Sequence, residues 1–122
     1  MDRSQGLVMQ PSKLTVRKDR KSLEVSYDDG QSFSFSAELL RVLSPSAEVQ
    51  GHSPEQRKTI GGKRNVEIMQ MEPVGQYAVR ITFDDMHNTG IFTWKYFREL
   101  GENQDQKWAE YLAELEEKGM VR

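Results

Sequence analysis

The chain has 122 residues, of which 36% are hydrophobic and 30% charged, and it contains no cysteine. This length and balance predict one small domain around a single core. The lack of cysteine excludes disulfides, thiolate nucleophiles, iron–sulfur clusters and cysteine zinc sites. No apolar run approaches the roughly 18 residues that a spanning helix needs. The N-terminus shows no apolar signal segment, so we expect a cytoplasmic protein without a membrane partner.

Charge is distributed unevenly along the chain, although the formal net charge is only −2. The first 23 residues hold six basic and two acidic residues, whereas the stretch from Glu99 onward holds seven acidic and three basic residues. A dipolar surface can orient a partner, but ordinary solvated faces give the same pattern. The acidic pI near 5.7 and the lack of an aromatic and basic stripe on the predicted strands argue against nucleic acid as the partner.

The first half of the chain predicts strands followed by a short helix. Residues 1–11 are expected to be a disordered lead, because their glycine, proline and polar residues discourage regular structure. From Lys13 onward apolar residues alternate with polar ones as far as Phe35, which predicts a three-stranded antiparallel meander. Asp29-Gly30 signals its second hairpin turn. Ser36 is expected to cap a helix over residues 37–43.

The second half predicts a hairpin and two helices. After a polar loop over residues 51–65, a strand over 66–71 leads through a turn at 73–75 into a central strand over 77–83. A helix over 94–100 is expected to start at the cap Thr93 and to stop before Gly101. The last helix is expected to begin at Asn103, with Gln106 completing a capping box. Its apolar stripe consists of Trp108, Tyr111, Leu112 and Leu115.

These elements predict an α+β fold, with a small, mostly antiparallel sheet made of a meander and a hairpin. Short helices and a C-terminal amphipathic helix complete it, and residues 12–122 form one domain. Neither an internal repeat nor a second domain is visible.

The turn after the central strand contains the residues best suited to a site. Asp85 and His87, together with His52 elsewhere, supply the two histidines and one carboxylate of a non-haem iron site. Such a site needs a rigid barrel, for which the chain is too short. The simpler interpretation is a turn in which Asp84 or Asp85 accepts backbone N–H bonds and His87 orients the bend at Gly90.

The polar loop carries four basic residues that form a second candidate site: Arg57, Lys58, Lys63 and Arg64. They lack the spacing of a phosphate-binding loop and no helix start follows them. As a group they suit an acidic protein surface, a carboxylate or a nucleic-acid backbone, although plain solvation is the simpler explanation and is preferred. Among the aromatic residues, Trp108 is expected in the core, whereas Trp94 and Tyr96 beside the His87 turn are candidates for a partner surface.

Four segments together resemble a known family: residues 39–49, the Gly-Lys-Arg sequence at 62–64, the hairpin at 72–79, and residues 83–94. Over roughly residues 12–101 the chain resembles the gamma-butyrobetaine hydroxylase-like N-terminal domain. In that family the domain occurs alone as a small bacterial protein of unknown function, in front of the oxygenase barrel of carnitine-synthesis hydroxylases, and attached to P-loop iron–sulfur carrier ATPases. The resemblance implies an accessory domain without an assigned reaction.

The resemblance also bears on metal binding. In the hydroxylases the domain holds a structural zinc through a Cys-Pro-Cys-x-x-Cys sequence and one histidine. The corresponding positions here are Ser44, Ser46 and Val49, with His87 as the remaining ligand. Serine hydroxyls are poor zinc ligands and valine is none, whereas structural zinc is normally held by four nitrogen or sulfur donors. The resemblance therefore implies a zinc-free version of the domain, and we expect no cofactor.

Two functions follow from these observations. The first is a non-catalytic protein-interaction or accessory domain, monomeric or weakly dimeric, with no catalytic residue. Its expected surface consists of Asp84, Asp85, His87, Trp94, Tyr96, Arg57, Lys58, Lys63 and Arg64. The second is a small-molecule or metal-binding accessory protein that uses the Asp85/His87 turn. An autonomous hydrolase is not expected, because no serine is accompanied by a recognisable acid–base pair.

Overall fold

The computed structural model describes residues 10–51 and 54–122. The expectation for residues 1–11 and the position of His52 therefore lie almost entirely outside the described residues. The elements in chain order are β1 (Lys13–Val16), β2 (Ser22–Ser26), β3 (Ser32–Ser36), α1 (Ala37–Val42), α2 (Ala47–Gln50), the 3₁₀ turn η1 (Pro54–Gln56), β4 (Ile68–Val74), β5 (Ala78–Phe83), β6 (Ile91–Thr93), α3 (Trp94–Glu102) and α4 (Gln104–Glu117).

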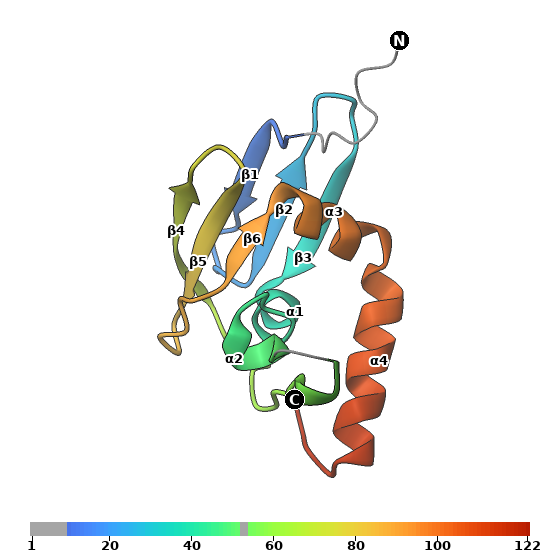
Figure 1. Ribbon diagram of the computed structural model, residues 1–122. Coiled ribbons are helices and arrows are strands. Elements are labelled where there is room, and N and C mark those ends of the chain that lie inside the picture. The colour runs from blue at the N-terminus through green and yellow to red at the C-terminus, as the bar shows by residue number, and fades with distance from the viewer. Residues whose placement is uncertain (1–9, 52–53) are drawn as a thin grey trace.

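The predicted α+β fold is confirmed, but its strands form two sheets instead of one. β1, β2 and β3 make an antiparallel meander, and β4, β5 and β6 make a second antiparallel sheet. Figure 1 shows the two sheets together at one end of the molecule, with α1 and α2 next to them and α4 along one side. None of the described helices is long and apolar enough to cross a membrane.

The meander forms where the period-two pattern places it. Leu23 and Val25 of β2 are fully buried and pair with Phe35 and Phe33 of β3. The turn between these strands has Gly30 at φ 89°, a conformation in which a side chain would be strained. The Asp29-Gly30 hairpin signal therefore marks the turn correctly.

The second sheet has β5 at its centre, as the alternating sequence predicts. β4 runs on through Pro73, which was expected in a turn. Proline is tolerated there because β4 is an outer strand and the missing N–H faces no neighbouring strand. β6 was not predicted, because three residues are too short to show a period.

Aromatic packing joins the two sheets. The ring of Phe97 in α3 lies 5.9 Å from that of Phe35 in the first sheet and 5.6 Å from that of Phe92 in the second, measured between ring centroids. All three side chains are fully buried. A backbone hydrogen bond of 2.8 Å from Ile68 N to Arg20 O also connects the sheets. One core therefore serves both sheets.

The caps of the first and third helices are confirmed. Ser36 Oγ accepts a hydrogen bond from Leu39 N at 3.0 Å, and Thr93 Oγ1 accepts one from Tyr96 N at 3.0 Å. The predicted capping box at Asn103 is wrong, because Asn103 makes no side-chain cap for α4 and instead donates its side-chain N–H to the carbonyl of Glu99. The Asn103 side chain therefore caps the end of α3 and not the start of α4.

Gly101 lies inside α3, so the prediction that this helix stops before it is wrong. A Cβ on Gly101 would meet the Phe33 ring at 2.5 Å. The glycine therefore marks the place where α3 contacts an aromatic ring of the first sheet. Close packing, and not helix termination, explains the residue.

We predict that Gly101→Ala lowers the free energy of unfolding by about 1–3 kcal/mol, because the added methyl overpacks the Phe33 ring. Urea denaturation followed by tryptophan fluorescence measures the change. In the Phe33→Leu background the same substitution should be less harmful, since the smaller side chain leaves room. Equal losses in both backgrounds would contradict this explanation.

Candidate functional site

The turn between β5 and β6 has a defined backbone shape. Met86 N donates to Phe83 O at 2.9 Å, Phe83 N donates to His87 O at 3.0 Å, and Met86 has φ 73°. Within the connection over residues 84–90, residues 84–86 therefore form a three-residue turn whose third position is left-handed, where glycine is usual. His87 N also donates to Asp85 Oδ1 at 3.0 Å. The sequence-based interpretation of an aspartate accepting a backbone N–H in this turn is confirmed.

The Asp85 carboxylate is held by two cations from other segments. Its Oδ2 lies 2.7 Å from Arg41 Nε of α1 and 2.6 Å from Lys63 Nζ of the polar loop. Burial alone raises the pKa of Asp85, but hydrogen bonds from Lys63, from the His87 backbone and from Arg41 outweigh it and lower the pKa to about 2. Asp85 is therefore ionised and already neutralised by its neighbours.

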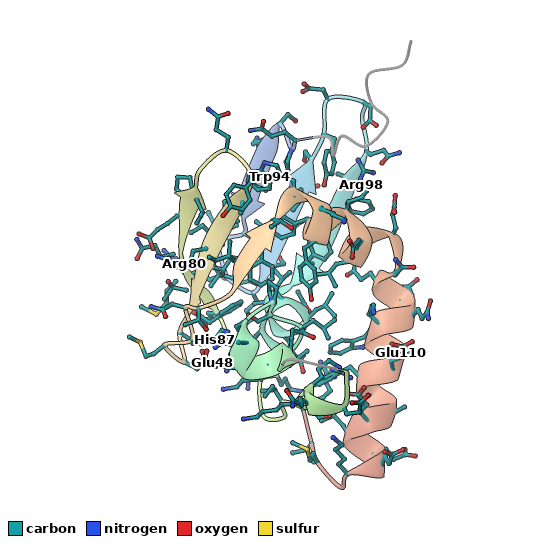
Figure 2. The ribbon with its side chains drawn as sticks, in the orientation of Figure 1. Glu48, Arg80, His87, Trp94, Arg98 and Glu110 are labelled. Atoms are coloured by element: carbon teal, nitrogen blue, oxygen red, sulfur yellow. The ribbon has the colours of Figure 1, made fainter. Side chains whose placement is uncertain are left out.

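The imidazole of His87 is also occupied on both nitrogens. Nε2 lies 2.9 Å from Ser44 Oγ, and Nδ1 lies 3.6 Å from Glu48 Oε1. Glu48 in turn accepts a hydrogen bond from Thr89. Only 7% of the His87 side chain is exposed, and burial, followed by the charge of Arg41, lowers its pKa. Figure 2 shows His87 and Glu48 side by side next to α2.

Ser44, His87 and Glu48 lie next to one another in space, with the histidine between the serine and the acid, as in a catalytic triad. The expectation that no serine has such partners is therefore wrong. Ser44, however, is fully buried. A Cβ on Gly90 would lie only 2.2 Å from Ser44 Oγ, so the backbone of Gly90 closes over the hydroxyl. A substrate carbonyl has no approach to it, and the three residues instead fix the turn against α1 and α2.

The other predicted site residues do not share one surface with His87. Trp94 lies beyond β6 at the opposite end of β5, where Thr93 pairs with Ala78, and Figure 2 shows it far from His87. Its Nε1 donates to Gln76 O at 2.8 Å. Asp84 stays at the turn, with Oδ1 accepting from Glu67 N at 3.1 Å. The continuous surface expected from the sequence is therefore divided.

The basic loop is divided in the same way. Lys63 contacts Asp85, whereas Arg57 forms an ion pair with Glu114 of α4. Lys58 and Arg64 are exposed. Half of this predicted basic cluster is thus used to attach the loop to the rest of the domain.

Arg57 and Tyr96 line a cavity of about 430 Å³ between the polar loop, α3 and α4. The Tyr96 hydroxyl donates to the carbonyl of Leu43, and burial raises its pKa to about 12. The Tyr111 hydroxyl donates to Ile60 O at 2.6 Å. Both rings are held in place, so the cavity is preformed. Polar side chains that line it include Gln50, Glu99, Asn103, Gln106, Lys107 and Glu110.

One protein family matches most of the chain. A family model described as gamma-butyrobetaine hydroxylase-like, N-terminal, matches residues 14–98. The chain belongs to this family. The match ends within α3, so α4 and the residues after it lie beyond the matched region.

Solved structures similar to this chain include two determined in solution by NMR. One is 46% identical with a TM-score of 0.80, covering 94% of this chain and 90% of the other. The second is 42% identical with a TM-score of 0.82, covering 97% and 88%. A third, a crystal structure of a protein of unknown function in the DUF971 family from Acidithiobacillus ferrooxidans, is 37% identical with a TM-score of 0.63, covering 75% and 92%. No curated protein matches the chain.

The zinc implied by the hydroxylase relatives can be tested against the residues present. The positions corresponding to its ligands offer two serine hydroxyls, one imidazole and the side chain of Val49, which has no donor. Ser44 is hydrogen-bonded to His87, and the buried Ser46 hydroxyl has no hydrogen-bond partner within the described part of the chain. Over residues 10–51 and 54–122, no group of three histidine, aspartate or glutamate side chains is arranged to hold a metal ion. This donor set does not fit structural zinc.

Sequence reasoning missed two residues that define the site, whereas the family resemblance had already put Ser44 and His87 at positions of one zinc site. Arg41 and Glu48 lie about forty residues before their partners Asp85 and Thr89. No spacing within the chain signals such long-range pairs. The available signal was charge, because Arg41 is the one basic residue of an otherwise acidic or apolar helix.

We predict that Asp85→Asn lowers the free energy of unfolding by about 1–3 kcal/mol at pH 7, because Arg41 and Lys63 lose their charged acceptor. The pKa of Asp85 is lower in the folded protein, so its stabilisation is complete above about pH 4 and disappears as the pH falls toward 2. Urea denaturation at pH 7 and near pH 2 measures the free energy of unfolding of the wild type and of Asp85→Asn. Asp84→Asn makes the same charge change at a carboxylate that forms no ion pair with the residues that the structure describes. Equal losses would refute the role of Asp85.

Proposed function

We propose that this protein is a non-catalytic interaction domain that docks onto another protein through the His87 turn. The observation that carries the proposal is Met86, whose side chain is 71% exposed at the tip of a rigidly supported turn. Family membership supports an accessory role, since the matching family is described as the N-terminal part of a hydroxylase-like protein.

Met86 is unfavourable for folding alone. A side chain in the left-handed conformation costs roughly 1–2 kcal/mol, which glycine would avoid. Asp85 and His87 on either side of it are anchored to α1, α2 and the polar loop. The turn therefore presents a large apolar side chain on a fixed base, as a preorganised binding surface does.

The surroundings of Met86 suit a protein partner. Met69, which is 50% exposed, lies in the bulge of β4 next to the strand end from which the turn starts. Methionine side chains adapt to varied partner shapes because they are flexible and polarisable. Asp84, which lies two residues before Met86 in the same turn, is exposed and charged. Apolar residues with a charged rim form the usual anatomy of a protein interface.

The non-catalytic part of the proposal is supported by the state of the reactive groups. Asp85 is neutralised by two cations, and both ring nitrogens of His87 face protein atoms. Ser44 is enclosed. These groups hold the turn in place. The role left to the turn is to present the exposed Met86 side chain to a partner.

A photocrosslinking experiment tests the docking site. We expect a variant with p-benzoylphenylalanine at position 86 to form an ultraviolet-dependent adduct with one host protein. The control places the same group at Tyr77, which is 56% exposed on the β4–β5 turn at the other end of the sheet. Excess unlabelled wild-type protein should suppress the adduct.

The competitor Met86→Gly separates binding from folding. It should be as stable as the wild type or more so by up to about 1 kcal/mol, because glycine accepts the left-handed backbone, yet it should fail to suppress the adduct. If it competes as well as the wild type, or if positions 86 and 77 give the same adducts, the proposed docking site is wrong.

The cavity between α3 and α4 favours a second candidate function, the binding of a small molecule. Its volume of about 430 Å³ lies within the range of ligand pockets. The Asp85/His87 turn, where the sequence placed this alternative, does not contribute to its lining. If a ligand is bound, the structure favours the cavity over the turn.

A small-molecule fragment set screened by NMR tests this candidate. Binding should shift the amide signals of Tyr96, Leu100 and Tyr111, and Gln106→Trp should abolish it by filling the cavity from the exposed face of α4. Ala113→Trp places the same ring on another exposed part of α4 as the control. Fragments that bind Gln106→Trp unchanged would exclude the cavity as their site.

A further inference from the structure

The segment after α4 returns to the domain and places an arginine on a buried carboxylate. Arg122 Nε and Nη2 donate to Glu38 Oε2 and Oε1 at 3.1 and 2.8 Å. Glu38 belongs to α1 and is only 5% exposed, whereas the Arg122 side chain is 36% exposed. The carboxylate is thus part of the domain, and the guanidinium covers it from outside.

A tryptophan completes the site. The Arg122 guanidinium carbon lies 5.2 Å from the centroid of the Trp108 ring of α4, within the range of a cation–π contact. The cavity at this place measures about 300 Å³ and is lined by Ser36, Glu38, Leu39, Gln104, Asp105, Trp108 and Arg122. Two parallel hydrogen bonds and an aromatic face are the features that recognise a guanidinium group, whereas an ammonium cannot satisfy both carboxylate oxygens in the same plane.

The segment that carries Arg122 is lightly attached. Apart from the Arg122 contacts, two backbone hydrogen bonds hold residues 120–122 within the described part of the chain: Gly62 N donates to Val121 O at 2.9 Å, and Met120 N donates to Leu115 O at 2.8 Å. Gly119 has φ 66° and leaves the helix end through open space. Met120 and Val121 line a shallow groove with Leu112 and Leu115 of α4. The segment can leave its place at the cost of these bonds, because Met120 and Val121 are exposed and are not part of the buried core.

We propose that Glu38 and Trp108 form a guanidinium-binding site, which Arg122 of the same chain fills here and from which an arginine-bearing segment of a partner protein displaces it. The occupant seen in the structure defines the chemistry of the ligand. Release of Arg122 would leave the Glu38 charge buried without a partner, which is unfavourable. A second guanidinium restores the pair, and apolar residues before it would take the places of Met120 and Val121 beside the groove that these residues line with Leu112 and Leu115.

The test uses the peptide acetyl-Met-Val-Arg-amide as the probe and the Arg122→Ala variant as the receptor. We expect the peptide to shift the indole N–H signal of Trp108 in the NMR spectrum, with that of Trp94 as an internal reference. Arg122→Ala should bind it at least about tenfold more tightly than the wild type, because the attached Arg122 competes at a high effective concentration. Glu38→Gln in the Arg122→Ala background should abolish binding.

The matched controls are acetyl-Met-Val-Lys-amide and the variant Glu116→Gln, which removes a carboxylate near the tail but outside the Glu38 site. The proposal is overturned if the lysine peptide binds as tightly, if Glu38→Gln binds normally, or if Arg122→Ala shows no shift at millimolar peptide. Should Arg122→Ala unfold, Arg122→Lys, which keeps a cation beside Glu38, replaces it under the same criteria. None of these outcomes depends on Met86, so the experiments test this site and the proposed docking turn independently.

Discussion

The ion pairs of Asp85 with Arg41 and Lys63 are the interaction on which the site depends. They join the β5–β6 turn, α1 and the polar loop at one carboxylate. Other side-chain contacts of the loop, from Arg57 and Thr59 to Glu114 and from Tyr111 to Ile60, attach it to α4 and not to the turn. An isolated surface ion pair contributes little to stability, but a carboxylate shared by two cations and a backbone N–H restricts three segments at once. The exposed tip of the turn keeps its shape for this reason.

Next to this network, the Ser44–His87 hydrogen bond attaches the turn a second time to the segment after α1. The zinc of the hydroxylase relatives would join the same two places through metal bonds. In this chain a hydroxyl and an imidazole join them with hydrogen bonds, and Gly90 fits tightly over the hydroxyl. Hydrogen bonds thus make, in this chain, the attachment that the resemblance to the hydroxylases assigns to zinc.

The local features of the fold were accessible from the sequence, whereas the long-range features were not. Alternation around Val25 and Ile81 identified the strands, and Ser36 and Thr93 identified two helix starts, because these signals act over a few residues. Gly101 was misread because a glycine at a helix end and a glycine under an aromatic ring look alike in sequence. The separation into two sheets was not predicted, because which strands pair with one another depends on tertiary structure and leaves no local pattern.

The site was partly predictable for the same reason. Asp85 and His87 stood out as polar residues in a turn after the central strand, and they are the residues around which the cluster forms. Trp94 was grouped with them because it is near in sequence, yet β6 carries it to the other end of β5. Arg41 and Glu48 were absent from the prediction because their pairing depends on tertiary structure alone.

Pro73 has a consequence for the way in which any partner can approach the second sheet. It lies in the outer strand β4, and the register of this strand shifts between Ile68 and Gln70. An incoming strand would find one amide donor missing and the hydrogen-bonding row interrupted, which are the means by which edges resist strand addition. Main-chain pairing along β4 is therefore disfavoured. A partner at the docking turn that we propose would therefore have to be recognised by side-chain shape and charge, which would leave specificity to a few residues open to substitution.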